Sequence, residues 1–398
     1  MKILFYLHKY PSYGGIENVT TYLANYFVNN QNEVSIYSFV GVDHDLLLKK
    51  LDSRICYCQA TNTDVYDSAA NYEQLKDLIA KKKVQYVIFQ DSYAPVDSLL
   101  KKMRMDGVKI KIITVEHNTP DAFLKALMYE RPSSVIERIK RKILYPWYYS
   151  KLFCLIRRRH KRIYRYSDRY VLLTQKFETT FKKITGIKHP KKLLAIHNPI
   201  TIETPEKINW GEKRKICLFP ARLVGQKGIH LLMSIWRKIE AKSTDLDLMI
   251  VGDGPERSFI ENSIKTYGLK HVILEGFQSE MQPYYKKASI LIATSIYEGW
   301  PLTLTESMSY GCIPVVFDSY LAASEIVEND YSGLVIPAFD IDMYVKKIIL
   351  LMTNFGKRKL LSQNALVSSE RFKIESIGMQ WDKMLNDVLY ENDNENDF

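Results

Sequence analysis

The chain has 398 residues, which is too long for one hydrophobic core, so we expect two domains. Its composition is 46% apolar and 25% charged, which excludes a disordered or fibrous protein. No stretch approaches about eighteen consecutive apolar residues, so no membrane-spanning helix is predicted. The net charge of +11 is concentrated in one segment, which is described below.

The start of the chain and the cysteines indicate a reduced, intracellular protein. The first apolar run, 3–7, is too short for a signal peptide and is typical of a first strand. The five cysteines are odd in number and lie mostly within apolar runs. Cys56 and Cys58 form a close pair, but no second pair completes a zinc site, so no metal is expected.

Short β-branched runs alternate with helical patterns along the chain. Helical patterns lie, for example, at 16–28, 229–241 and 256–267. Strands that are separated by helices predict an α/β fold with parallel sheets and right-handed crossovers. The runs expected to be strands are 3–7, 34–39, 86–90, 110–115, 170–173, 194–197, 216–220, 248–251, 272–275, 290–293, 315–317 and 333–336.

The alternation restarts after a proline-bounded polar link at 199–205. We therefore expect one Rossmann-like domain over 1–200 and a second over 201–374. Ligands of such folds bind at the carboxyl ends of the strands, and a cleft between two facing sheets is the natural ligand site.

Two carboxylates are predicted at the carboxyl end of the second sheet. Glu298 lies in a turn after the strand 290–293, and Glu306 lies in the short helix that follows. Pro301 is expected as the first residue of that helix, and Gly311 is expected to end it. Glutamates at this spacing are common by chance, so the flanking strand, proline and glycine carry the prediction. Carboxylates at this edge accept hydrogen bonds from hydroxyl-rich ligands such as ribose and hexose.

Two weaker signals follow predicted strands of the first domain. Gly14 and Gly15 come after the first strand and open a helix, where glycine lets the backbone approach a ligand and helix amides face an anion. The same pair is also typical of a simple turn. His117 follows the strand 110–115 and is suited to bond a substrate hydroxyl, although a single histidine is more often structural.

A pair of cations follows the first strand of the second domain. Arg222 and Lys227 project from the glycine-containing loop 221–228, which opens the helix 229–241. Fixed cations beside a helix N-terminus suit a diphosphate. The loop is not a P-loop, because the glycine spacing and the Lys-Ser/Thr pair are absent.

A second glycine-containing turn follows the strand 248–251. Gly252 and Gly254 resemble the start of a dinucleotide fingerprint, but Arg257 stands where the third glycine is required. We therefore do not interpret this segment as part of a dehydrogenase. We interpret it as a tight strand-to-helix turn that leaves room for a nucleotide.

The segment 138–165 contains eleven Lys and Arg residues and no acid, which equals the whole positive surplus. Aromatic and aliphatic residues are interleaved with them. This pattern suits the surface of an anionic membrane, which we favour over a solvated helix with a core-facing stripe and over a nucleic-acid patch. The basic residues are Arg138, Lys140, Arg141, Lys142, Lys151, Arg157, Arg158, Arg159, Lys161, Arg162 and Arg165.

The order of these motifs resembles retaining glycosyltransferase family four, whose members have the two-domain GT-B fold. The likeness is strong over 215–340. Over 1–200 it is weaker, but the matching motifs keep the same order. Its most specific element is the glutamate pair, and the last helix, 375–392, resembles one that crosses back onto the first domain. The motifs are Gly14-Gly15, His117, Asn198-Pro199, Arg222 with Lys227-Gly228, Gly252-Asp253-Gly254-Pro255, Gly276-Phe277, and Glu298 with Glu306.

The resemblance implies a role for each matching position. The catalytic residues would be His117 near the anomeric centre of the donor sugar, Arg222 and Lys227 on the diphosphate, and Glu298 near the sugar. Glu306 would bind the ribose. Members often have glycine where this chain has Pro301, which leaves the accepted sugar open. The implied nucleotide-sugar-binding residues are Gly14, Gly15, Gly252, Gly254, Phe277, Gly299, Leu302 and Glu306.

The implied activity is transfer, with retention, of a hexose-type sugar from a nucleoside-diphosphate sugar, with a UDP-sugar preferred. The acceptor would be a hydroxyl of a glycan or a lipid-linked molecule in bacterial capsule, O-antigen or lipopolysaccharide synthesis. The protein would be cytoplasmic and peripheral on the inner face of the cell membrane, which it contacts through residues 138–165. No cofactor, metal or nucleic-acid partner is implied. The alternatives are a nucleotide-sugar epimerase of related fold and a non-catalytic membrane-associated scaffold.

Overall fold

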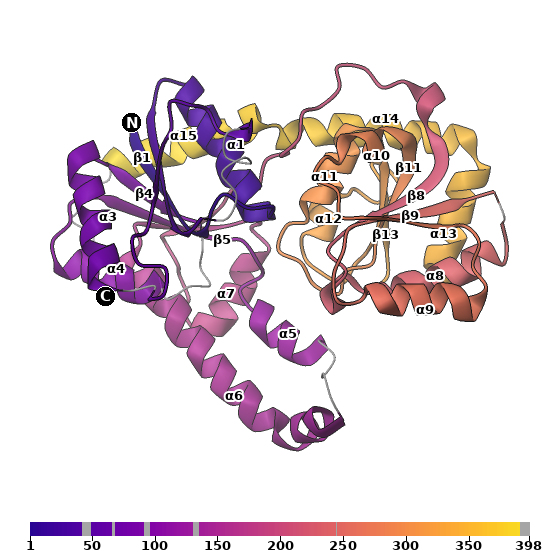
Figure 1. Cartoon of the computed structure of the whole chain (residues 1–398), viewed down its shortest axis with the longest axis horizontal. Helices are drawn as coiled ribbons and strands as arrows, with labels where there is room; N and C mark the ends of the chain where they lie inside the picture. The colour runs from indigo at the N-terminus through magenta and orange to yellow at the C-terminus, as the bar shows by residue number, and fades with distance from the viewer. Residues whose placement is uncertain (42–48, 66–67, 91–95, 130–134, 244, 391–398) are drawn as a thin grey trace. The chain divides into compact units, whose positions relative to one another are not determined.

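The computed structural model describes residues 1–41, 49–65, 68–90, 96–129, 135–243 and 245–390, without the side chains of residues 135–143, Glu212 and Tyr390. The chain divides into two compact units (Figure 1). Unit 1 contains Met1–Asp121, Ser150–Thr201 and Phe372–Phe398, and unit 2 contains Ala122–Tyr149 and Ile202–Arg371.

Unit 1 is built on a seven-stranded parallel sheet with the order β3-β2-β1-β4-β5-β6-β7. In β1, residues 3–7 are all buried, as is typical of a central strand that helices cover on both faces. The strands are β1 Lys2–Lys9, β2 Glu33–Val40, β3 Cys56–Gln59, β4 Tyr86–Phe89, β5 Lys111–Glu116, β6 Arg169–Leu172 and β7 Leu193–Ala195.

The helices of unit 1 include the last helix of the chain, α15, which packs against α1 (Figure 1). The Tyr26 hydroxyl of α1 donates to the Asp382 carboxylate at 2.7 Å, and the Tyr86 hydroxyl of β4 donates to the Leu385 carbonyl at 3.0 Å. A Cβ at Gly378 would lie 2.3 Å from the Tyr26 ring, so the two helices approach as closely as a glycine allows. The helices are α1 Gly15–Asn29, α3 Ala69–Lys82, α4 Val96–Met105, α7 Phe177–Thr185 and α15 Ile374–Tyr390.

Unit 2 contains a six-stranded parallel sheet with the order β10-β9-β8-β11-β12-β13. The strands are β8 Arg214–Pro220, β9 Asp247–Val251, β10 Val272–Gly276, β11 Ala288–Ala293, β12 Ile313–Phe317 and β13 Leu334–Ile336. The helices are α5 Ala122–Tyr129, α8 Ile229–Glu240, α9 Arg257–Tyr267, α10 Gln282–Lys287, α11 Leu302–Ser309, α12 Ala323–Ile326, α13 Ile341–Thr353 and α14 Phe355–Ser369.

The two parallel sheets with interleaved helices confirm the predicted α/β class, and every predicted strand is present. The sequence prediction missed β3, an edge strand that is only half-buried and lacks a continuous apolar run. The prediction that Pro301 is the first residue of a helix was wrong by one position, because Pro301 is the N-cap with ψ near 104° and α11 begins at Leu302. Gly311 follows the end of α11 with a φ of +65°, as expected for a helix stop.

The longest helix, α6 (Val135–Tyr166), has two halves of different character. Its C-terminal half buries Ile156, His160 and Ile163, which lie on one helical face. In its N-terminal half, the described side chains from Leu144 to Tyr149 are mostly exposed. Of the basic residues predicted to bind a membrane, the side chains of Arg138 and Lys140–Lys142 lie outside the described residues. No helix among the described residues is long and apolar enough to cross a membrane.

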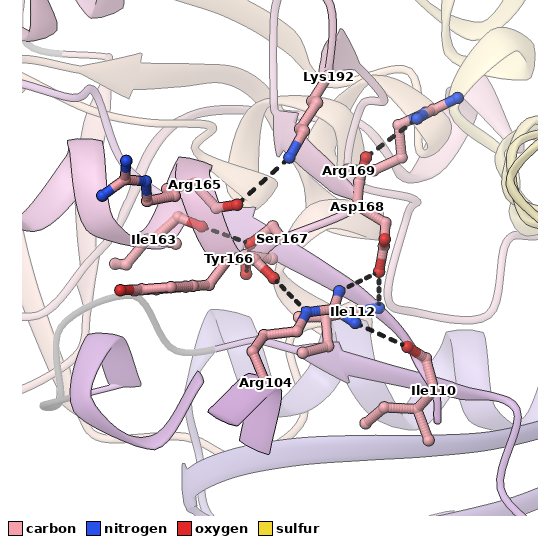
Figure 2. Close-up of polar contacts among 11 residues, drawn as sticks. Arg104, Ile110, Ile112, Ile163, Arg165, Tyr166, Ser167, Asp168, Arg169 and Lys192 are labelled. Atoms are coloured by element: carbon pink, nitrogen blue, oxygen red, sulfur yellow. Dashed lines mark hydrogen bonds and ion pairs between the residues drawn. The ribbon is translucent and has the colours of Figure 1, made fainter. Parts of the chain in front are cut away.

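Arg104 of α4 holds the end of α6 against the sheet (Figure 2). Its Nε donates to the Tyr166 carbonyl at 3.0 Å, and its Nη1 donates to the Ile110 carbonyl at 3.2 Å. Its Nη2 lies 2.5 Å from Asp168 Oδ2, which also accepts from the backbone N–H of Ile112 at 2.6 Å. One guanidinium therefore satisfies carbonyls and a carboxylate where α6 ends and where β5 and β6 begin.

We predict that Arg104→Ala lowers the free energy of unfolding by about 1.5–3 kcal/mol, because it leaves several partly buried acceptors unpaired. Urea denaturation measures the loss. Arg162→Ala is the matched control, since Arg162 pairs with Asp97 at 3.2 Å but its side chain is 65% exposed. That change is expected to cost about 0–1 kcal/mol. Equal effects of the two substitutions would contradict the anchoring role of Arg104.

Candidate active site

The strand order of unit 2 reverses between β8 and β11, which are neighbours in the sheet. From β8 the chain builds outward through β9 and β10, and it then returns to build β11, β12 and β13 on the other side. Open α/β sheets bind ligands outside the carboxyl ends of the strands at such a reversal. The loops after β8 and β11 carry Arg222, Lys227 and Glu298, so the predicted residues lie where the fold favours a ligand.

These two loops are in direct contact. The amino group of Lys227 forms an ion pair with the Glu298 carboxylate, and the Lys227 and Glu298 side chains are 19% and 9% exposed. The amide of Gln226 donates to the Tyr297 carbonyl at 2.9 Å, and the backbone N–H of Ile296 donates to the Gln226 carbonyl at 2.8 Å. A Cβ at Gly228 would lie 2.1 Å from the Thr294 carbonyl oxygen, so this approach requires glycine. The structure therefore brings Lys227 and Glu298 together.

Arg222 lies on the same loop and differs from Lys227 in its surroundings. Its side chain is exposed, and among the described residues its guanidinium has no hydrogen-bond or ion-pair partner. A second cation of this edge, Arg257, is already neutralised by Asp253 at 3.6 Å and by Glu261 at 2.9 Å. Arg222 is thus available to an anionic ligand, whereas Lys227 is held by Glu298.

The turn that contains Gly252 and Gly254 packs against the loop that carries Arg222. The Leu223 N–H donates to the Asp253 carbonyl at 2.8 Å, and the Gly252 N–H donates to the Gly276 carbonyl at 2.7 Å. A Cβ at Gly252 would lie 1.9 Å from the Ala221 carbonyl oxygen, and one at Gly254 would lie 2.6 Å from that of Leu223. Both glycines have positive φ values, +139° and +155°. Their visible role is therefore to let two loops pack backbone against backbone.

Glu306 lies in α11 and is buried, with 7% exposure. Its Oε2 accepts a hydrogen bond from the Tyr285 hydroxyl at 3.0 Å. Burial, and then the charge of Glu306, raise the pKa of Tyr285 well above its ordinary value, so the tyrosine stays a donor. Gly299 is buried in the loop before α11, and Leu302 begins that helix, whose N-cap Pro301 offers no side-chain cap. The first amides of α11 are therefore not capped by that residue.

Two further residues of this edge differ in exposure. Phe277, one of the predicted nucleotide-sugar-binding residues, follows β10 and is 58% exposed. Tyr320, which sequence reasoning missed, follows β12 and is 4% exposed, and its hydroxyl has no hydrogen-bond partner within the described residues. Burial and the nearby charge of Glu298 raise its pKa well above the ordinary value. The sequence signal for Tyr320 is the polar stretch Asp318-Ser319-Tyr320 after the predicted strand 315–317.

In unit 1, Gly14 and Gly15 lie at the start of α1, after β1. Gly14 is the N-cap and has extended backbone, with no side-chain cap. A Cβ at Gly14 would lie 2.0 Å from Glu17 Oε2, so the glycine makes room for a carboxylate of the first turn. A negative side chain near a helix N-terminus is favourable, and here it lies where the sequence predicted a ligand anion.

His117 follows β5 and is half-buried. Its Nε2 lies 2.5 Å from Oε1 of Gln90, a fully buried residue after the neighbouring strand β4. Burial of the ring lowers the pKa of His117 to about 3, so the imidazole is neutral at physiological pH. Sequence reasoning missed Gln90, because no motif surrounds it.

A buried polar cluster ties down the segment that carries His117. The Tyr170 hydroxyl lies 3.0 Å from Glu116 Oε2 and 2.8 Å from His160 Nδ1. His160 Nε2 donates to the Pro120 carbonyl at 3.0 Å. Burial lowers the pKa of His160, and the charge of Glu116 opposes that shift. Because Glu116 and Pro120 flank His117, this cluster fixes both sides of the predicted catalytic residue.

Metal ligands are not gathered in the part of the chain that the structure describes, where no group of at least three His, Cys, Asp or Glu side chains could hold an ion. Cys56 and Cys58 are free thiols on β3.

Two family models match the chain. The model described as Glycosyltransferase Family 4 matches residues 13–204, and the model described as Glycosyl transferases group 1 matches residues 201–367. Together they cover both parallel sheets and the loops described above. The chain belongs to the family-four type of glycosyltransferases, and it is a transferase enzyme.

Individual relatives and structures extend this likeness over nearly the whole chain. The amylovoran biosynthesis glycosyltransferase AmsD of Erwinia amylovora is 22% identical over 97% of this chain and 99% of its own length. An alpha-1,4-N-acetyl-D-galactosaminyltransferase of Campylobacter jejuni, whose named acceptor is a glycan on PP-undecaprenol, is 24% identical over 98% and 99%. The crystal structure of Anabaena HepE in complex with UDP-glucose matches with a TM-score of 0.76 and 15% identity, over 97% and 100%. The GT-B fold is thereby confirmed.

We predict that Gly252→Ala lowers the melting temperature of the protein and weakens nucleotide binding. The new Cβ would overlap the Ala221 carbonyl, and backbone strain alone costs roughly 1–3 kcal/mol. Calorimetry measures both effects. Gly225→Ala is the control, because a Cβ there meets nothing within 4 Å and its φ is not in the left-handed region. If Gly252→Ala behaves like this control, the packing role of the glycine is wrong.

Proposed function

We propose that this glycosyltransferase moves a hexose-type sugar, with retention of configuration, from a UDP-sugar to a hydroxyl of a glycan or lipid-linked acceptor. The pathway we propose is synthesis of a bacterial surface polysaccharide. This choice is supported by AmsD, whose name refers to amylovoran biosynthesis, and by the Campylobacter enzyme, whose name refers to a glycan on PP-undecaprenol. The complex of HepE with UDP-glucose supports a uridine donor.

The observation that carries the proposal is the arrangement of charge on the loops after β8 and β11. Arg222 has no partner among the described residues, while Lys227 on the same loop is paired with Glu298. An arginine fork without a carboxylate partner is suited to bind a diphosphate. Arg222 therefore gives unit 2 an available cation for a departing nucleoside diphosphate, and Lys227 lies on the same loop.

In the proposed reaction, the bond between the anomeric carbon and the diphosphate breaks while Arg222 and Lys227 neutralise the charge that develops on the diphosphate. The acceptor hydroxyl attacks on the face from which the diphosphate leaves, and its proton passes to the departing phosphate. The anomeric configuration is therefore retained. The Glu306 carboxylate binds the ribose hydroxyls, and His117 of unit 1 contacts the donor sugar. No metal or cofactor is part of this proposal.

We predict that Arg222→Ala slows UDP release from the preferred UDP-sugar by about 100-fold, equivalent to ~3 kcal/mol of transition-state stabilisation. The preferred UDP-sugar is chosen beforehand by thermal shift, with GDP- and ADP-sugars screened for comparison. The fold should be unaffected, since Arg222 is exposed. Lys227→Ala is the less clean test, because it also leaves the buried Glu298 carboxylate without its partner.

Arg257→Ala is the matched control for this assay. Arg257 belongs to the same edge of the sheet, but it is neutralised by its own carboxylates, so the change should alter UDP release by less than about threefold. A near-normal rate in Arg222→Ala would remove the diphosphate role. The assay also separates an epimerase, which converts the sugar without any acceptor, and a scaffold, which binds no nucleotide.

We further propose that the protein works as a peripheral protein on the cytoplasmic face of the membrane, where α6 contacts the lipid surface. Trp147 is 56% exposed and Leu155 is 53% exposed, and the basic residues Lys151, Arg157 and Arg158 lie on the same exposed stretch. Exposed aromatic and aliphatic side chains among cations are typical of helices that lie on anionic lipid. A membrane location would bring the enzyme to a lipid-linked acceptor.

We predict that a triple variant, Lys151→Gln, Arg157→Gln and Arg158→Gln, binds anionic vesicles about 100-fold more weakly, since each cation contributes ~1 kcal/mol near such a surface. Vesicle flotation at low salt measures binding.

The matched control removes equal charge from exposed lysines elsewhere in unit 1, with Lys81, Lys101 and Lys109 each changed to Gln. It should bind vesicles almost as well as the original protein. If both variants lose the same affinity, net charge and not α6 determines binding, and if neither does, the membrane proposal fails.

A further inference from the structure

Gln90 is a buried polar residue whose side chain has one hydrogen-bond partner, His117, among the described residues. Its side chain is fully buried, its Oε1 faces His117 Nε2 at 2.5 Å, and its backbone N–H donates to the Tyr6 carbonyl at 3.0 Å. Its amide Nε2 makes no hydrogen bond to any residue that the structure describes. Burying amide donors without partners is unfavourable, so stability does not explain why an amide stands here.

The contact with Gln90 determines which nitrogen of His117 carries the proton. An amide oxygen only accepts hydrogen bonds, so the facing Nε2 of His117 must be the N–H. The ring is neutral, because burial lowers the pKa of His117. The other nitrogen, Nδ1, therefore has a free lone pair, and it makes no hydrogen bond to a described residue. If the Gln90 side-chain amide were rotated by 180°, its NH₂ group would face Nε2 and His117 would carry its proton on Nδ1 instead. A measurement of the His117 tautomer therefore tests the contact directly.

We propose that Gln90 is a positioning residue that fixes His117 as the neutral Nε2–H tautomer, so that Nδ1 accepts a hydrogen bond from a hydroxyl of the sugar substrate. This inference rests on the proposed function, and it narrows the substrate. A lone pair on Nδ1 attracts a hydroxyl donor and repels a carboxylate. The group that meets His117 is thus a hydroxyl, as in neutral hexoses and N-acetylhexosamines, and not the carboxylate of a uronic acid.

The chemical identity of residue 90 is central to this proposal. A carboxylate in the same place would favour the imidazolium form of His117, which donates from both nitrogens. A neutral amide orients the ring without charging it. Gln90 therefore sets His117 as an acceptor over the whole physiological pH range.

The first test reads the tautomer in the free, full-length protein by long-range ¹H–¹⁵N NMR, with the His117 signals assigned from their absence in His117→Gln. We expect a protonated Nε2, an unprotonated Nδ1 and no titration between about pH 5.5 and 8.5. Gln90→Glu should introduce a titration above the ordinary histidine value. A protonated Nδ1 in the original protein, or titration near the ordinary pKa of 6.5, would overturn the proposal.

The second test separates positioning from packing. Gln90→Leu removes the unpaired amide, so the melting temperature should stay the same or rise, while kcat falls about 10- to 100-fold with little change in KM. Gln85→Leu, just before the same strand, removes only an exposed hydrogen bond from the Lys2 backbone N–H, so kcat should stay unchanged and the melting temperature should change little. Unchanged kcat in Gln90→Leu, or a loss of activity that parallels a loss of stability, would refute the positioning role.

The two tests also distinguish this inference from the proposed function. If the original protein transfers sugar from no nucleotide donor, the proposed function fails, yet the NMR experiment still decides whether Gln90 sets the tautomer of His117. If transfer occurs and a UDP-uronic acid is used as well as a neutral UDP-hexose, the substrate inference fails while the proposed function stands.

Discussion

The close approach of the loops after β8 and β11 is the constraint on which unit 2 depends. Because Gly228 has no Cβ, the Thr294 carbonyl oxygen can lie where any other side chain would clash with it. The ion pair of Lys227 with Glu298 holds the two loops together. Because those loops flank the reversal of strand order, their approach sets where a diphosphate would meet cations. The loop that carries Arg222 is held by backbone contacts with the turn of Gly252 and Gly254. The Arg222 side chain takes no part in these contacts and stays available to a ligand.

In unit 1, as in unit 2, contacts between neighbouring segments hold the candidate site residue in place, but here the contacts are buried hydrogen bonds and not an ion pair. There the carboxyl ends of β4 and β5 carry Gln90 and His117, and buried groups on α6 and β6 hold the flanking residues Glu116 and Pro120. The ring of His117 is thus oriented by hydrogen bonds before any ligand arrives, which is the usual requirement for an electrostatic role in a reaction. At the amino ends of β5 and β6, Arg104 anchors the end of α6, the helix that carries His160 (Figure 2).

Sequence patterns predicted what depends on local order, and they missed what depends on tertiary contacts. The periodicity of buried strands placed every strand except β3, whose half-buried residues carry no continuous apolar signal. Proline and glycine located α11 to within one residue. The pairing of Lys227 with Glu298 was not predictable, since the residues are far apart in sequence and each was interpreted alone. Gln90 and Tyr320 were missed because a single polar residue after a strand becomes informative only when its partners are known.

The position of α15 has a consequence for how the protein is made. Most of unit 1 precedes unit 2 in the chain, but the partners of Tyr26 and Tyr86 are Asp382 and the Leu385 carbonyl, which are synthesised after unit 2. The intervening sequence of unit 2 is complete before then. The part of unit 1 that is synthesised first therefore lacks α15, and the surface that α15 covers stays exposed, while unit 2 is synthesised. Unit 1 is thus begun before unit 2 but completed after it.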